Sequence, residues 1–195
     1  MDTHKKCAFI GHRNVYITDE LREIVQSVVE DLICKCGVET FLFGSRSNFD
    51  ALCHAVVTEL RGKYRSVKRV CYPCKSEACV LESGKQKLEA AYSRLFGKKV
   101  ELQAFDEEVE HKAKFTAGRA SYVERNQAMI DDCDYCVFYY DENNKPEARK
   151  TGRATNACSA PRSGTKLAYE YAVKKKKMII NVATVVGEKG GGEII

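Results

Sequence analysis

Two stretches near the amino terminus share one order of features, and that order constrains the fold more than any other part of the sequence. Residues 7–10 form a short apolar run that ends in Gly11-His12-Arg13, and residues 18–33 then show a helix start followed by apolar residues at helical spacing. Residues 40–43 repeat the apolar run and end in Gly44-Ser45-Arg46, again followed by an amphipathic helical pattern. A short apolar run is typical of a strand that is buried on both faces of a parallel sheet. The repeated unit therefore predicts a chain of the α/β class.

The rest of the chain continues this alternation. Further strands are expected at residues 67–72, 100–105, 135–140 and 178–182, and further helices at residues 82–96, at residues 120–132 and from Ser163 onward. The alternation predicts a Rossmann-like fold, with a mainly parallel sheet and helices on both faces. Ligands of such sheets bind at the carboxyl ends of the strands, so we expect the turns after successive strands to gather at one edge.

The length of the chain bounds its domain organisation. A chain of 195 residues with 44% hydrophobic content suits one α/β domain, and we expect a single domain over residues 1–195 with its core at 6–183. The polar segment 142–162 lacks periodicity, and we interpret it as a candidate lid loop. Residues 187–195 are expected to form a flexible tail. No run of about eighteen apolar residues occurs and the first residues do not resemble a signal peptide, which predicts a cytoplasmic protein with no membrane partner.

Ten cysteines are scattered along the chain. A domain of this length does not need disulfides, so we expect reduced thiols. Cys71 and Cys74, and likewise Cys133 and Cys136, have the two-residue spacing of zinc sites. We nevertheless predict no metal site, because no histidine lies near either pair and the spacing of the second pair along a strand would turn its members to opposite faces. No cofactor is expected.

Ser163-Gly164-Thr165 forms a small turn that leads directly into a helical pattern. The first main-chain N–H groups of a helix have no acceptor within the helix, and the helix dipole adds about half a positive charge, so this turn can hold a phosphate. In the alternative interpretation, Ser163 or Thr165 merely caps the helix. Residues 145–189 hold eleven Lys or Arg against three Asp or Glu. This basic charge around the turn fits a solvated face, a phosphate ligand or nucleic acid.

Five motifs in this order resemble the SLOG superfamily, which includes the Lonely-Guy phosphoribohydrolases and the DNA-processing protein Smf. They are the strand ends Gly11-His12-Arg13 and Gly44-Ser45-Arg46, the helix motif of residues 122–131, the strand that ends at Asp141, and Ser163-Gly164-Thr165 with the Tyr-Glu-Tyr-Ala of residues 169–172. The resemblance covers residues 6–183 and is strongest to a bacterial branch. It implies a Rossmann-like fold and a ligand that is a nucleotide or derived from one.

The resemblance also implies roles for individual positions. Arg125 matches the arginine that Lonely-Guy enzymes place on a helix beside their phosphate-binding turn, and Ser163-Gly164-Thr165 matches the turn itself. Two glycines of the family's turn are absent, however, and Leu167 stands where the enzymes have a catalytic glutamate. Catalysis is therefore left open, with Arg125 and Glu170 as the remaining catalytic candidates.

The expected ligand site combines these motifs with the turns after the strands. Arg13 and Arg46 have guanidinium groups that suit phosphate or base recognition, although surface arginines are common. His12 is either a general base or a locally hydrogen-bonded side chain, and Asp50 either binds a ribose hydroxyl or caps its helix. The predicted ligand-binding residues are Gly11, His12, Arg13, Gly44, Ser45, Arg46, Asp50, Arg125, Asn126, Asp141, Ser163, Gly164 and Thr165.

Three functions are compatible with this sequence. The leading hypothesis is a sensor or ligand-binding protein for a nucleotide-derived small molecule, held at the carboxyl ends of the strands. The alternatives are a phosphoribohydrolase that acts on nucleoside monophosphates and a nucleic-acid-binding module in the manner of Smf. Base-stacking aromatics would favour the last, but the basic segment offers only Tyr169 and Tyr171. A second copy of the chain, in a homo-oligomer, is a further expected partner.

Overall fold

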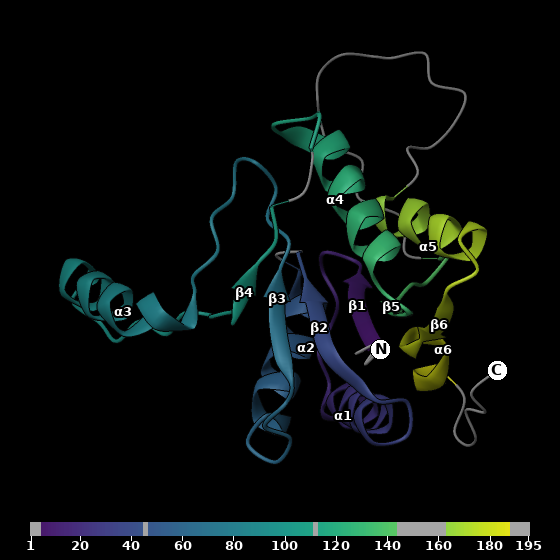
Figure 1. Ribbon diagram of the computed structural model, residues 1–195, viewed down its shortest axis with the longest axis horizontal. Helices are drawn as coiled ribbons and strands as arrows, with labels where there is room; N and C mark the ends of the chain where they lie inside the picture. The colour runs from purple at the N-terminus through teal and green to yellow at the C-terminus, as the bar shows by residue number, and fades with distance from the viewer. Residues whose placement is uncertain (1–4, 45–46, 111–112, 144–162, 188–195) are drawn as a thin grey trace.

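The computed structural model describes residues 5–44, 47–110, 113–143 and 163–187, and a sheet of six strands lies at its centre (Figure 1). The strands are β1 (Lys5–Gly11), β2 (Val38–Phe43), β3 (Lys68–Cys71), β4 (Glu107–Glu108), β5 (Tyr135–Tyr139) and β6 (Met178–Asn181). Their order across the sheet is β4-β3-β2-β1-β5-β6, and all neighbours are parallel. The direction of this order reverses between β1 and β5, which places a topological switch point at their carboxyl ends.

Helices lie on both faces of this sheet, as the alternating pattern predicts, and the described residues form six helices in all. They are α1 (Asp19–Cys34), α2 (Asn48–Leu60), α3 (Glu82–Phe96), α4 (Gly118–Asp132), α5 (Gly164–Lys174) and α6 (Val182–Gly187). The buried residues of α1 and α2, with the first residue of α6, pack into one core, and those of α4 and α5 pack into a second. The predicted Rossmann-like α/β class is therefore confirmed.

The apolar run of β1 explains why two cores form. Cys7 and Phe9 point into the core under α1 and α2, whereas Ala8 and Ile10 point into the core under α4 and α5. Side chains of a strand alternate between faces, so a run that is apolar at every position is buried on both sides. The chain thus places β1 at the middle of the molecule.

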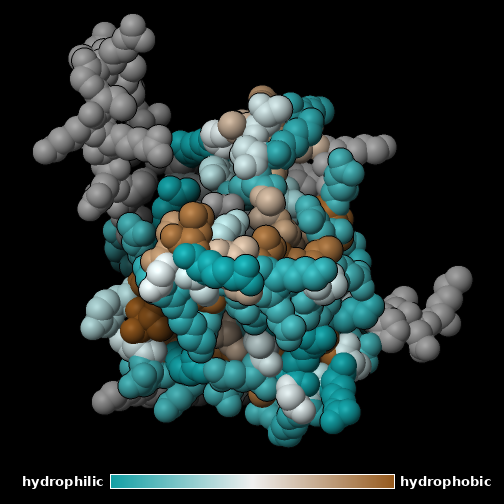
Figure 2. Space-filling model, turned by 90° about the vertical axis from the view of Figure 1, so that its left-hand side faces the viewer, coloured by the Kyte–Doolittle hydropathy of each residue, from teal (hydrophilic) through white to brown (hydrophobic). Residues whose placement is uncertain are grey.

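Helix α3 differs from the other long helices because none of its residues is buried. It projects away from the sheet (Figure 1), and its large apolar side chains are exposed: Leu88 38%, Tyr92 40%, Leu95 73% and Phe96 61%. Figure 2, seen from this side of the molecule, shows hydrophobic residues gathered in a band between hydrophilic ones. None of the described helices is long and apolar enough to cross a membrane.

The strand expected at residues 100–105 is wrong. The main-chain N–H groups of Val100 and Leu102 donate instead to the side chains of Ser93 and Glu89 on α3, at 3.0 and 2.9 Å. Only Phe105 makes an isolated bridge, and the edge strand is the two-residue β4 further along. Side chains of α3 therefore take the hydrogen bonds that a sheet neighbour would have supplied. The short helix α6 also has no counterpart in the sequence-based expectations.

The cysteines depart from expectation at two places. Cys71 and Cys79 form a disulfide, so the expectation of reduced thiols is wrong for this pair. The Sγ atoms of Cys133 and Cys136 lie 3.4 Å apart, whereas their spacing had suggested opposite faces. Strand alternation does not apply to them, because Cys133 precedes the start of β5 at Tyr135. The described residues contain no group of three or more His, Cys, Asp or Glu side chains that could hold a metal ion.

Candidate functional site

The first turn of α5 lies directly against the end of β1. The Thr165 hydroxyl donates a hydrogen bond of 3.0 Å to the carbonyl oxygen of Gly11, and Thr165 is buried. The Ser163 hydroxyl accepts the main-chain N–H of Lys166 at 3.0 Å, so it caps the helix. Both hydroxyls of the predicted phosphate turn are therefore used to fix α5 in place.

The main-chain groups of this turn, in contrast, remain open. The N–H groups of Gly164 and Thr165 have no acceptor in the part of the chain that the structure describes. A Cβ atom placed on Gly164 would meet no atom of the described residues within 4 Å. We call Ser163-Gly164-Thr165 the α5 turn; its free N–H groups and the helix dipole can hold an anion.

His12 directly follows β1, and its contacts hold this edge of the sheet together. Its Nε2 atom lies 3.1 Å from both the main-chain nitrogen and the carbonyl oxygen of Asp141, and its main-chain N–H donates to Tyr139. Burial lowers the pKa of His12 below its ordinary value. The Asp141 carboxylate accepts the N–H of Asn143 at 2.8 Å. His12 thus joins the ends of β1 and β5, which is the local role weighed in the sequence.

Arg125 lies on the inner face of α4 and is 2% exposed. Its guanidinium donates to the carbonyl oxygen of Gly44, and at 3.0 Å to Oδ1 of Asn126, and it lies 3.6 Å from the carboxylate of Glu77. The Tyr122 ring lies 5.2 Å from this guanidinium, and its hydroxyl lies 3.4 Å from Glu77. We call these five residues the Arg125 cluster. Its arginine is buried among protein partners rather than open to a phosphate.

Gly44 is required for this arrangement. A Cβ atom there would lie 2.8 Å from the Arg125 side chain and 2.8 Å from Sδ of Met129, closer than non-bonded atoms approach. The glycine that follows β2 therefore admits Arg125 across the strand end. Met129 and Arg125 lie on the same face of α4, since residues four apart on a helix are neighbours.

Arg13 is the arginine of this edge that remains exposed. Its guanidinium carbon lies 5.9 Å from the centre of the Tyr122 ring, so the aromatic ring of the Arg125 cluster also contacts a surface cation. Its carbonyl oxygen accepts the N–H of Asn48 at the start of α2, which holds the turn after β1 against that helix. Arg13 is thus held at the edge while its charge faces solvent.

The other predicted residues take different places. Asp50 is buried in the first turn of α2, and its main-chain N–H donates to Ser47, so Ser47 is the cap and Asp50 is not. Glu170 is exposed on α5, one turn from Leu167. Ser45 and Arg46 lie outside the described residues, as do residues 144–162 of the candidate lid.

The described basic residues of segment 145–189 do not gather around the α5 turn, as the sequence suggests they would. Residues 174–177 are at the far end of α5, about 16 Å from its first turn at 1.5 Å per residue. Lys175 pairs with Asp131 at 2.7 Å, and Lys177 donates to the carbonyl oxygen of Cys133 at 2.5 Å. These four lysines therefore do not surround the α5 turn, and Lys166 is the described lysine of α5 beside it. Most of the remaining basic residues of the segment lie in 145–162, outside the described residues.

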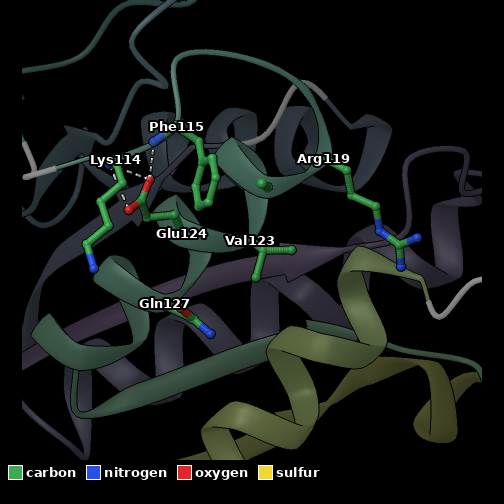
Figure 3. A pocket seen from close by; sticks show the side chains of 7 residues that line it. Lys114, Phe115, Arg119, Val123, Glu124 and Gln127 are labelled. Carbon is green, nitrogen blue, oxygen red and sulfur yellow. Dashed lines mark hydrogen bonds between the residues drawn. The ribbon is translucent and has the colours of Figure 1, made fainter.

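A hollow of about 570 Å³ lies on the outer face of α4 (Figure 3). It is lined by Lys114, Phe115, Arg119, Ala120, Val123, Glu124 and Gln127. The Glu124 carboxylate accepts the main-chain N–H groups of Lys114 and Phe115 at 2.8 and 3.1 Å, which fixes this segment against the helix. Neither this hollow nor the contacts of Arg125 with Glu77 and Tyr122 were predicted from the sequence. The spacing of Tyr122, three residues before Arg125, could have indicated their contact, because residues three apart lie on the same face of a helix.

Comparison with known proteins supports the fold alone. The structure is similar to that of DNA processing protein A from Helicobacter pylori, a protein described for its single-stranded DNA binding mode, with a TM-score of 0.50 and 14% sequence identity. The alignment covers 91% of this chain and 65% of that chain, so this chain spans about two thirds of its length. No family model and no curated protein matches this sequence. The neighbour shares the Rossmann-like arrangement of this chain.

Proposed function

We propose that this chain is a ligand-binding or sensor protein of the SLOG type, which holds the phosphate of a nucleotide or nucleotide-derived molecule between β1 and β5. The observation that carries the proposal is the 3.0 Å hydrogen bond from Thr165 to the carbonyl oxygen of Gly11. It joins the α5 turn to the strand end at the switch point of the sheet, where parallel α/β sheets bind their ligands.

The chemistry of the edge favours an anionic ligand. Free N–H groups at the α5 turn donate hydrogen bonds, the helix dipole attracts negative charge, and the exposed guanidinium of Arg13 lies on the same edge. Gly164 leaves space for a phosphate beside the main chain. In this proposal Gly11, Arg13 and the α5 turn contact the ligand, whereas His12 and the Arg125 cluster hold the edge in shape.

A substitution at Gly164 tests this proposal. Gly164→Leu places a side chain in the open space and should abolish the binding of AMP, ADP and ADP-ribose measured by titration calorimetry. Gly84→Leu is the matched control, because Gly84 is also a helical glycine with nothing within 4 Å of its Cβ position. Wild-type affinity in both variants would mean that the α5 turn is only a helix start.

A single-stranded nucleic acid is the second candidate ligand. The observation that favours it is the fold shared with the DNA processing protein, which binds single-stranded DNA. The position of Lys174–Lys177 at the far end of α5 weighs against it, since those charges do not lie beside the turn. Binding of a single-stranded oligonucleotide with a steep dependence on salt would favour this candidate, because phosphate contacts release counterions.

Hydrolysis of nucleoside monophosphates has less support from the geometry. Glycoside cleavage needs a carboxylate near the reacting carbon, and Leu167 supplies none. Glu170 is exposed, and Arg125 is paired within the protein. We therefore propose binding without this reaction.

A further inference from the structure

The hollow on α4 contains charged and aromatic groups that the fold itself does not use. Lys114 and Arg119 are both exposed, and neither forms an ion pair with any carboxylate in the described ranges. Phe115 is 52% exposed, although it is an aromatic side chain beside an apolar surface. Only the Glu124 carboxylate is engaged, because it binds the main chain of residues 114 and 115.

The arrangement of these groups is specific. Figure 3 shows the Phe115 ring over the middle of the hollow near Val123, with Lys114 and Arg119 on its two sides. The hydrogen bonds to Glu124 fix the main chain of residues 114 and 115 against α4, so the backbone that carries the ring needs little ordering when a ligand stacks on it. An aromatic plane between two cations matches a flat, neutral ring linked to an anionic group, as a nucleobase is linked to its phosphate through the sugar.

We propose that this hollow binds one nucleotide unit, with the base on Phe115 and the phosphate on Lys114 or Arg119. The inference rests on the proposed function, because it assigns the hollow to the same ligand that is held at the α5 turn. α4 and α5 pack against each other, and in Figure 3 the Arg119 side chain extends toward α5. The ligand class is therefore a dinucleotide with two phosphates, rather than a mononucleotide.

An acidic peptide fits the hollow less well. Its carboxylates would meet the two cations, but the exposed Phe115 ring and the Val123 side chain offer a flat apolar surface rather than a row of donors. Stacking on such a surface is available to every base, and it adds to the ionic contacts without requiring a particular sequence.

The test compares AMP with the 5′-phosphorylated dinucleotide pApA by titration calorimetry. We expect pApA to bind wild-type protein at least about five-fold more tightly than AMP, since base–aromatic stacking contributes about five-fold to 150-fold per base. Phe115→Ala should remove this advantage and leave the affinity for AMP unchanged. Phe96→Ala is the matched control, because Phe96 is an exposed phenylalanine on α3, outside the hollow, and this variant should behave as wild type.

The outcomes separate this inference from the proposed function. Equal affinities for AMP and pApA in the wild type, or a pApA advantage that survives Phe115→Ala, would overturn the hollow as a subsite while the site at the α5 turn stands. If none of AMP, ADP, ADP-ribose and pApA binds, the proposed function fails and this inference fails with it. A thermal melt of each variant shows that it is folded, and exposed Phe115 is not needed for the core.

Discussion

The α5 turn and the Arg125 cluster differ in how fully their polar groups are paired, although family-like motifs mark both. At the α5 turn, the main-chain N–H groups of Gly164 and Thr165 have no acceptor among the described residues. In the Arg125 cluster, the guanidinium is buried and contacts a carbonyl, an amide and a carboxylate. Motifs therefore locate the edge of the sheet, whereas the hydrogen-bond partners decide which groups remain available for a ligand.

The largest expected effect concerns the buried arginine. Arg125→Met removes the cation that pairs with Glu77 and the donor to the carbonyl of Gly44. It should lower the free energy of unfolding by about 3 kcal/mol, because the largely buried Glu77 carboxylate loses the charge that compensates it. Arg13→Met is the matched control at an exposed position, with an expected change within about 0.5 kcal/mol. Urea unfolding curves measure both values. Equal losses in the two variants would remove the distinction between a structural and an available arginine.

The next effect compares the two glycines of these regions. Gly44→Ala places a methyl group 2.8 Å from Arg125 and Met129, and it should lower the free energy of unfolding by about 2 kcal/mol through overpacking. Gly164→Ala meets open space in a helix, and it should leave stability unchanged or raise it by up to about 1 kcal/mol. Urea unfolding again gives both numbers. A tolerated Gly44→Ala would show that the Arg125 cluster can shift, and that Arg125 could reach a ligand.

Much of the fold could be predicted from local patterns. The apolar runs of β1 and β2 identified central strands because both sheet faces are buried there, and Thr18 signalled the start of α1, whose cap it forms at 3.1 Å. The strand at residues 100–105 could not be excluded, because its hydrogen bonds go to side chains of α3. The exposure of Leu95 on α3 could not be predicted either, since the helical pattern of a segment does not show whether another element covers that helix.

The candidate site was predicted less completely, for a physical reason. The cap at Ser163 was one of the two interpretations weighed, and the contact from Thr165 to Gly11 agrees with the expectation that the turns gather at one edge. The difference between Arg13 and Arg125, however, depends on Glu77, which lies 48 residues before Arg125 in the sequence. Such long-range partners leave no local pattern, so residue type alone could not show which guanidinium is free.

The smallest expected effect concerns His12, which belongs to the paired groups of this edge. Burial lowers the pKa of His12 from its ordinary value of 6.5, so the unfolded chain binds a proton at a pH where the folded protein does not. Stability therefore rises with pH across this window and is lost as the pH falls below about 6.5. His54 is buried as well, and its pKa is also lowered, so it contributes in the same direction. Carboxylates such as Asp106 titrate at lower pH and do not contribute to this window.

His12→Gln removes one of the two histidines and should reduce the loss of stability between pH 7.5 and pH 5.5 without abolishing it, because His54 remains. Urea unfolding at the two pH values measures the difference. The variant will also lose some stability at pH 7.5, since Nε2 of His12 bonds the main chain of Asp141. The change with pH, rather than the absolute value, is thus the relevant quantity. The same pH dependence in variant and wild type would mean that the imidazole is accessible to protons in the folded protein, and His12 would then join Arg13 among the groups available to a ligand.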